Sequence, residues 1–103
     1  MNLPELTANV EHVASQYSQE FGVTYTNDWF LLKLQEEFGE MTRAHLMLTN
    51  RTRRKAASEL EAKKALADEI ADVFAYVLLF AKNMDIDIEA ALTKKWFAYL
   101  PKP

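Results

Sequence analysis

The feature that most constrains the fold is the near absence of residues that interrupt helices. The only glycines are Gly22 and Gly39, and the three prolines, Pro4, Pro101 and Pro103, lie close to the two ends of the sequence. Between these positions apolar residues recur at spacings of three and four, and no segment shows the alternation of a half-buried strand. The sequence therefore predicts an all-α fold with long helices.

Four helices are expected from this periodicity and from residues that cap helix ends. Ser58 followed by Glu61 has the form of a capping box, which predicts that a helix begins there. Short connections favour antiparallel neighbours, so we expect a four-helix antiparallel bundle in one domain, residues 1–103. The expected helices run from about Pro4 to Phe21, from Asn27 or Asp28 to about Asn50, from Ser58 to the "DID" of residues 85–87, and from Ile88 to Tyr99.

Each of the two central helices carries an apolar stripe that is expected to form the core. Apolar residues also lie away from this stripe on the second helix, at Leu32, Leu46 and Met47. One small chain cannot cover apolar residues on several sides of a helix, so we expect a homodimer or a dimer of dimers. The core stripes are expected at Leu31, Leu34, Phe38, Met41, His45 and Leu48, and at Leu66, Ile70, Val73, Val77, Phe80 and Met84.

Charge and composition argue against several classes of function. The 12 basic and 15 acidic residues give a net charge of −3 without a continuous basic surface, so binding to a nucleic acid polymer is not expected. Cysteine is absent, which excludes disulfides and thiolate metal sites. The longest apolar run, Val73 to Ala81, is too short to span a bilayer, and residues 1–12 lack the pattern of a signal peptide. We therefore expect a cytoplasmic protein without a membrane partner.

Two pairs of acidic residues lie at the edges of the expected core. Glu37 and Glu40 are three residues apart on the second helix, which places both on one helix face. Glu69 and Asp72 repeat this spacing on the third helix. At about 100° per residue, the members of each pair lie roughly 70° and 130° from the centre of the apolar stripe. Along the chain, Glu37 and Asp72 are equally far from the centre of the linker between the two helices, and so are Glu40 and Glu69. Folding the two helices back on each other therefore predicts that the four carboxylates meet at one position.

Four converging carboxylates beside an apolar core repel one another unless a cation or protons neutralise them. Ligation by oxygen alone suits Mg²⁺ or Mn²⁺, which enzymes commonly share between carboxylates and substrate phosphates. A diiron site is less favoured, because neither His12 nor His45 lies three residues after a glutamate. The alternative to a metal site is that each pair belongs to an ordinary solvated helix surface.

The acidic pairs belong to two longer stretches, "LQEEFGEMTRAHL" and "LADEIADVFAYVLLFAKNMDIDIEAAL". Over about residues 29–92 the chain resembles the MazG-like all-α nucleoside triphosphate pyrophosphohydrolases, whose signature is EExxE followed by ExxD. The matching residues are Glu36, Glu37 and Glu40, then Glu69 and Asp72.

This resemblance implies an oligomeric, Mg²⁺-dependent enzyme that cleaves an NTP or dNTP between the α and β phosphates. The products are a nucleoside monophosphate and pyrophosphate. It implies that Glu37, Glu40, Glu69 and Asp72 hold the metal. Glu36 would orient the attacking water or a second ion, so the implied catalytic residues are Glu36 and Glu37.

Basic and aromatic residues near the acidic pairs are candidates for substrate binding. Family members often carry a lysine with a following asparagine near the carboxy terminus. Here the segment is "KKWFAYLPKP", in which Lys94 or Lys95 would serve as the lysine and no asparagine follows. Aromatic side chains near the site favour stacking on a nucleobase. The candidates are Lys33, Lys63, Lys64, Lys94 and Arg54 for phosphate, Trp29 and Tyr76 for the base, and Asn83 for the base or a subunit contact.

The expected function is hydrolysis of nucleotides in the upkeep of the nucleotide pool. Two alternatives remain open. One is a phosphoribosyl-ATP pyrophosphohydrolase, which shares the architecture and the bond cleaved. The other is a non-catalytic helical oligomer that serves as an adaptor or regulatory module. No residue type in the sequence encodes a base or sugar preference.

Overall fold

The structure is a computed structural model that describes residues 1–103 and contains helices but no strands. The all-α class and the predicted order of four helices are confirmed. The elements are α1 (Leu3–Phe21), α2 (Asn27–Leu48), α3 (Glu59–Asn83), α4 (Ile88–Lys95) and a final 3₁₀ turn, η1 (Phe97–Tyr99). None of the helices is both long enough and apolar enough to cross a membrane.

Side-chain caps explain where the helices begin. The predicted capping box is present, since the backbone N–H of Glu61 donates to Ser58 Oγ at 3.1 Å. The cap of α2 is Thr26, whose Oγ1 accepts from the backbone N–H of Trp29 at 3.1 Å, one residue before the expected Asn27 or Asp28. Gly22 ends α1 in the left-handed conformation, with φ of 67°, which glycine adopts without strain.

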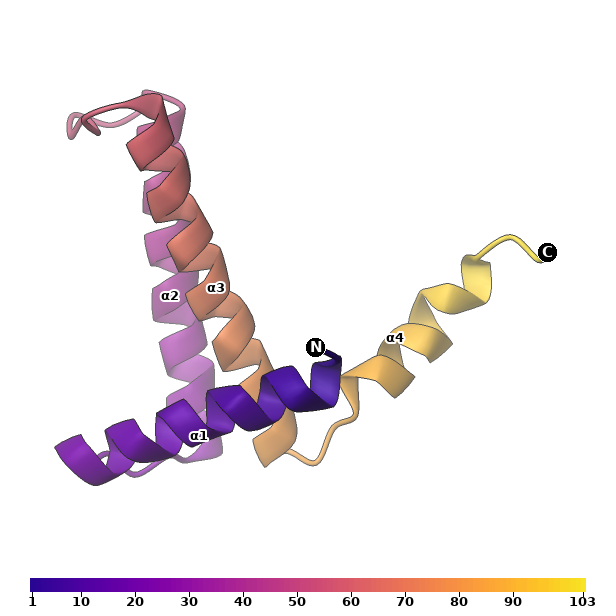
Figure 1. Cartoon of the computed structure of the whole chain (residues 1–103). Coiled ribbons are helices and arrows are strands. Elements are labelled where there is room, and N and C mark those ends of the chain that lie inside the picture. Colours follow the sequence, from indigo (N-terminus) through magenta and orange to yellow (C-terminus); the bar gives the residue numbers. More distant parts are fainter.

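Only the two central helices pack side by side along their length. They form an antiparallel hairpin, whereas α1 crosses its base and α4 extends away from it (Figure 1). α4 packs on η1 and makes almost no contact with the other helices. The predicted four-helix antiparallel bundle is therefore not closed within a single chain. Sequence periodicity gives the faces of helices but not the crossing angles, which depend on what those faces meet.

The seam between α2 and α3 is rotated from its predicted position. Phe30 and Ala44 are buried and fourteen residues apart, with Glu37 midway between them. Leu31 and Phe38, by contrast, are 43% and 56% exposed. At about 100° per residue the seam is turned by roughly 70° toward the acidic side of α2. The prediction of the core stripe on α2 was thus partly wrong. The seam is centred on Glu37, and a stripe defined by apolar residues alone does not include a carboxylate.

Four large apolar residues form a second, exposed surface on the hairpin, which we call the apolar hairpin face: Leu31 and Phe38 of α2 with Ile70 and Phe74 of α3. On each helix these positions lie on the side of the seam opposite Glu40 or Asp72. Their exposed fractions run from 43% to 56%. The hairpin therefore has an acidic side and an apolar side, with little core between them: six residues of the chain are buried.

Candidate metal and nucleotide site

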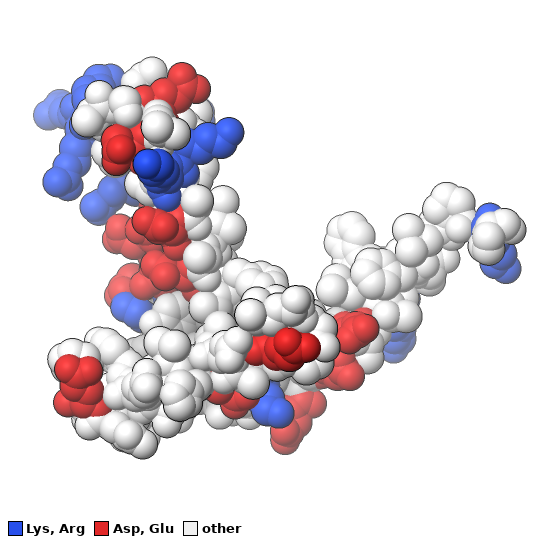
Figure 2. Space-filling model, viewed as in Figure 1, with Lys and Arg blue, Asp and Glu red and all other residues white.

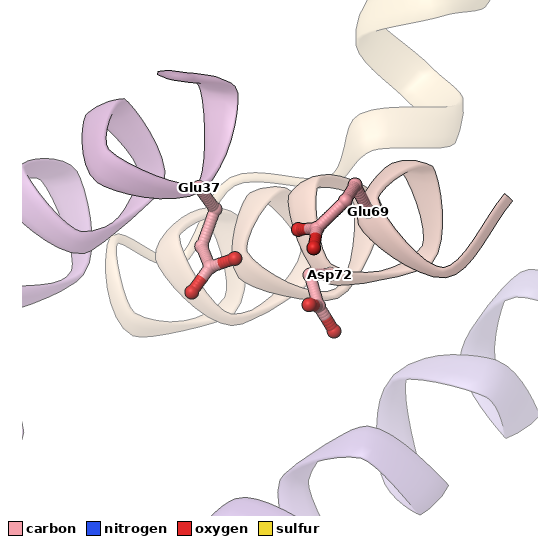
Figure 3. Close-up of side chains that lie close together, drawn as sticks. All are labelled: Glu37, Glu69 and Asp72. Carbon is pink, nitrogen blue, oxygen red and sulfur yellow. The ribbon is translucent and has the colours of Figure 1, made fainter. Parts of the chain in front are cut away.

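Three of the predicted metal ligands converge in the structure. Glu37 projects from α2 across the seam toward Glu69 and Asp72 of α3 (Figure 3). One carboxylate oxygen of each residue can be chosen such that all three lie within 4.8 Å of one another. We call these three residues the acidic trio. The pairing of the two helices, inferred from equal distances to the linker, brings the residues together as predicted.

The acidic trio is partly withdrawn from water. The side chain of Glu37 is 14% exposed. Glu69 Oε2 is buried and has no hydrogen-bond partner, and no other buried side-chain nitrogen or oxygen in the protein lacks one. An unsatisfied buried carboxylate oxygen is costly, and such atoms are rare in folded proteins. This oxygen is therefore suited to bind a cation at the trio.

Burial and repulsion between carboxylates both disfavour the charged forms of Glu37 and Glu69. Burial is the main cause that raises the pKa of Glu37 and of Glu69, and the charge of Asp72 is the second cause for each. Lys33 opposes this effect at Glu37 and lowers its pKa, but not enough to cancel the rise. A bound cation would remove the repulsion that the protein's own residues leave in place.

Lys33 is the cation that accompanies the trio. Its Nζ lies 2.6 Å from Glu36 Oε1 and 3.5 Å from Glu37 Oε1. The hydrogen bond to Glu36 is the largest contribution that raises the pKa of Lys33, so the ammonium form is favoured. The prediction that Lys33 lies beside the acidic residues is consistent with this geometry, and its role in substrate binding stays a prediction.

Glu36 and Glu40 lie outside the trio. Glu36 is 63% exposed and pairs with Lys33. Glu40 is 44% exposed, and its Oε2 lies 4.0 Å from Arg43 Nη1. The charge of Glu40 nevertheless contributes to raising the pKa of Glu69, so the two carboxylates are near neighbours. Glu40 can join the three carboxylates of the trio only if its side chain turns away from Arg43.

An aromatic cluster adjoins the trio. The rings of Trp29 and Tyr76 have centroids 6.1 Å apart, and Tyr25 lies between α1 and this pair, 4.8 Å from Trp29. The hydroxyl of Tyr25 donates to the carbonyl of Ala14 at 3.0 Å, which fixes the ring against α1. Burial raises the pKa of Tyr76, while Lys33 acts in the opposite direction. Trp29 and Tyr76 are among the residues predicted from the sequence to bind substrate, whereas Tyr25 is not. Tyr25 precedes α2, and its place in the cluster depends on contacts with α1 and Trp29.

A groove of about 380 Å³ opens between α1 and α3 beside this cluster. Its lining is mainly apolar and includes Val13, Tyr17, Tyr25 and Tyr76, with Asp72 of the trio at its edge. An apolar groove that ends at a group of carboxylates suits a ligand with a flat apolar part and a part that binds a metal.

The remaining candidates lie further from the trio. Asn83 Nδ2 donates to Asn27 Oδ1, which ties the end of α3 to the start of α2. Lys63 and Lys64 are exposed and form no ion pair. Arg54 belongs to the loop at the hairpin tip, where Figure 2 shows basic side chains gathered beyond the acidic side. Lys94 is on α4, which extends away from the hairpin.

The residues of the trio fit a divalent cation. All the donors are carboxylate oxygens, the set that Mg²⁺ and Mn²⁺ prefer, and one of them is buried without a partner. Nitrogen and sulfur ligands, which would favour zinc, are absent from the group. The trio thus has the chemistry of a hard-cation site.

One comparison with known proteins gives a match over the region of the chain that contains the site. The family model described as the MazG nucleotide pyrophosphohydrolase domain matches residues 25–96, a range that contains the hairpin, the trio and the aromatic cluster. No curated protein and no solved structure gives a significant match.

Proposed function

The chain belongs to the MazG nucleotide pyrophosphohydrolase family, and we propose that it hydrolyses an NTP or dNTP between the α and β phosphates with Mg²⁺. The products are a nucleoside monophosphate and pyrophosphate. Such a reaction removes unwanted nucleotides from the pool. The observation that carries the proposal is the buried, unpartnered oxygen of Glu69 within the acidic trio, because it calls for a cation next to a groove suited to a nucleotide.

Glu37, Glu69 and Asp72 would hold the ion, Mg²⁺ or Mn²⁺, and Glu40 would join them when its side chain turns from Arg43. When bound, the ion supplies charge neutralisation for the phosphates and activation of a water. The protein's part is to keep the three carboxylates in place before the substrate arrives. The α2–α3 seam does this, since it holds Glu37 and Glu69 between two rigid helices.

Lys33 and Glu36 would act on the substrate side of the trio. The Lys33 ammonium lies between two carboxylates, so it can exchange one of them for a phosphate oxygen without losing its charge partner. This exchange would free Glu36, which is 63% exposed and can orient the attacking water. Lys63 and Lys64 on α3, and Arg54 at the tip, remain candidates for the distal phosphates.

The groove between α1 and α3 would take the base. Tyr76 lines this groove together with Asp72, and the Trp29 ring centroid lies 6.1 Å from that of Tyr76. Stacking on aromatic rings accepts any base. This arrangement puts the phosphates toward the trio and the base toward α1. Asn83 is held by Asn27, so a base contact would require it to leave that hydrogen bond.

The proposed enzyme is a homodimer or a dimer of dimers. Two copies can cover the apolar hairpin face of Leu31, Phe38, Ile70 and Phe74, which is otherwise in water. Packing two hairpins by this face would complete a four-helix core from two chains and leave the acidic side of each hairpin open.

The test is release of pyrophosphate from a panel of NTPs, dNTPs and phosphoribosyl-ATP with Mg²⁺, with EDTA as the metal-free control. We expect turnover that EDTA abolishes and that Glu37→Gln lowers by at least about a hundredfold, since the change removes one charge from the metal site. Glu59→Gln, the same change at an exposed position of α3, should keep the parental rate. Absence of pyrophosphate from every substrate, or full activity in Glu37→Gln, would refute the proposal.

A further inference from the structure

Helix α1 crosses the base of the hairpin (Figure 1) and forms one wall of the groove proposed for the base, but few contacts hold it in place. No residue of α1 is buried. The helix forms no ion pair and no hydrogen bond with α2 or α3. Val13 and Tyr17, which line the groove from α1, are 64% and 49% exposed. The position of this wall therefore depends on a small number of contacts.

One of these contacts comes from Tyr25, which lies between α1 and α2 in the sequence. Its hydroxyl donates to the carbonyl of Ala14 at 3.0 Å, across eleven residues of the chain. The other side-chain hydrogen bond between α1 and this connection joins the Ser18 hydroxyl to the Val23 carbonyl, close to the end of the helix. Tyr25 is thus the side chain from outside α1 that reaches its middle.

The ring of Tyr25 is itself held by the start of α2. It stacks on the ring of Phe30, with centroids 5.0 Å apart and planes at 24°, and its centroid lies 4.8 Å from that of Trp29. Phe30 is 4% exposed, so it gives the ring of Tyr25 a fixed support. Burial raises the pKa of Tyr25, which keeps the hydroxyl protonated and able to donate. Tyr25 therefore connects α1 to a buried part of the hairpin.

Tyr25 also separates two hollows of the protein. On one side lies the groove of about 380 Å³ that has Asp72 at its edge. On the other side lies a cavity of about 460 Å³ whose lining includes charged residues. Tyr25, Ala14 and Leu79 line both spaces. Because the side chain of alanine is small, the Tyr25 ring and Leu79 supply most of the partition, and without the ring the apolar groove would join the polar cavity.

We propose that Tyr25 is a positioning residue for the base: it holds α1 at the distance from α3 that forms the groove, and it closes the inner side of the groove. The effect on the base rests on the proposed function, whereas the hold on α1 does not. The hydroxyl of Tyr25 is used by Ala14 and its ring by Phe30, and the trio belongs to α2 and α3 alone. Tyr25 therefore acts on how tightly the nucleotide binds and not on how fast the bond is cleaved.

The first part of the test measures the hold on α1 without any use of activity. Tyr25→Phe removes only the hydroxyl. Tyr17→Phe is the matched control, because Tyr17 also lines the groove but its hydroxyl forms no hydrogen bond. Amide hydrogen exchange of the metal-free proteins is followed by mass spectrometry.

We expect the amides of α1 to exchange about two- to tenfold faster in Tyr25→Phe, the factor that corresponds to the loss of one hydrogen bond. The amides of α3 should exchange as in the parent, and Tyr17→Phe should leave both helices unchanged. Parental exchange of α1 in Tyr25→Phe, or equal acceleration in the two variants, would overturn the hold on α1.

The second part asks whether this hold serves the base. Since no residue of α1 is buried, its docking is weak, and Tyr25→Phe should raise KM for an NTP or dNTP by about two- to tenfold with kcat within about twofold of the parent. Inorganic triphosphate, which has phosphates but no base, serves as a competitive inhibitor. Its inhibition constant should be the same in the parent and in Tyr25→Phe. Tyr25→Leu should raise KM further, because it joins the groove to the polar cavity.

The outcomes of this second part decide separate claims. A higher KM with unchanged inhibition by inorganic triphosphate supports a residue that positions the base. A parental KM beside faster exchange of α1 means that Tyr25 holds the helix but does not position the base. A fall in kcat, or weaker inhibition by inorganic triphosphate, means that Tyr25 supports the whole site and not the base in particular. If the parent releases no pyrophosphate, the proposed function and the effect on the base fail together, and hydrogen exchange still decides whether Tyr25 holds α1.

Discussion

Phe30 and Glu37 occupy equivalent positions in the molecule and have opposite chemistry. Both lie on the α2 side of the seam, seven residues apart, and both are largely withdrawn from water: Phe30 is 4% exposed and the Glu37 side chain 14%. Phe30 meets aromatic neighbours, with its ring centroid 5.0 Å from that of Tyr25. Glu37 meets two more carboxylates. The pairing of α2 with α3 thus creates two environments. The aromatic contacts of Phe30 stabilise the fold, whereas the repulsion between the carboxylates at Glu37 destabilises it.

The difference between the two positions shows how a small protein can hold a destabilising group of carboxylates in place. The helices are joined near the base of the hairpin by Phe30 and by Leu78, Leu79 and Ala81, all of which are buried. This region contributes packing without charge, so it can hold the trio together against its own repulsion. A carboxylate that lies in a helix seam beside other carboxylates is therefore a functional candidate.

The largest effect on activity is expected when Glu37 is replaced by an apolar residue, as at Phe30. Glu37→Leu fills the seam with an apolar side chain and removes a metal ligand. We expect hydrolysis to fall by on the order of a thousandfold or more, because several kcal/mol of charge stabilisation are lost. The metal-free protein should become more stable, since apolar replacement of buried charge is often neutral or stabilising by about 1–4 kcal/mol. A stable and fully active variant would show that Glu37 is not part of the site.

The reverse change weakens the apolar end of the seam. Phe30→Ala is expected to lower the free energy of unfolding by about 3–5 kcal/mol, the usual cost of deleting a buried aromatic ring. Leu32→Ala on the same helix, at a position 65% exposed, should cost well under about 1 kcal/mol. Urea unfolding of the two variants measures both values. Equal losses would mean that the seam does not carry the stability of the hairpin.

Metal binding should act on the trio and not on the aromatic end. Mg²⁺ at a hundred times its Kd is expected to stabilise the parent by about 2.7 kcal/mol, seen as a rise in Tm. Glu37→Leu should show little or no rise, whereas Leu32→Ala should respond as the parent does. A rise of the same size in Glu37→Leu would place the binding site elsewhere.

The smallest effect is a dependence of stability on pH in the metal-free protein. The pKa values of Glu37 and Glu69 are raised above 4.5 in the folded state, so the folded protein binds more protons than the unfolded chain. Stability from these two groups is therefore greatest at low pH and falls as pH rises from about 4.5 through the raised values. Glu69→Gln should make this decline shallower, and melting curves from pH 4 upward, with EDTA present, measure it. An unchanged decline in Glu69→Gln would assign the effect to other groups.

The predictions from the sequence were most reliable where the structure depends on residues that are close together in the sequence or that belong to one hairpin. Helix order follows from the positions of glycine and proline, and the start of α3 follows from Ser58 and Glu61. The meeting of Glu37 with Glu69 and Asp72 follows from equal distances to the linker. Each of these depends on residues near one another in sequence or on a single hairpin.

The predictions failed where several elements must meet. The core stripe of α2 was placed on Leu31 and Phe38, which are exposed, because apolar periodicity does not tell a face that meets another helix of the chain from a face left in water. Short connections predict antiparallel neighbours, which holds for α2 and α3, but they do not predict that α1 crosses the base of the hairpin or that α4 extends away from it. Tyr25 entered the aromatic cluster through contacts with α1 and α2 that no local pattern encodes.

The sequence by itself determined an all-α chain, its family signature and the carboxylates that converge on the hairpin, because helix formation and hairpin register are set by local spacing. Only the tertiary structure decided that Glu37 lies in the seam and not at its edge. It alone showed that Glu69 has an oxygen without a partner, that Glu40 turns to Arg43, and that α4 leaves the hairpin. Each of these depends on how whole helix faces meet across the chain, where the packing of many side chains outweighs the preference of any one residue.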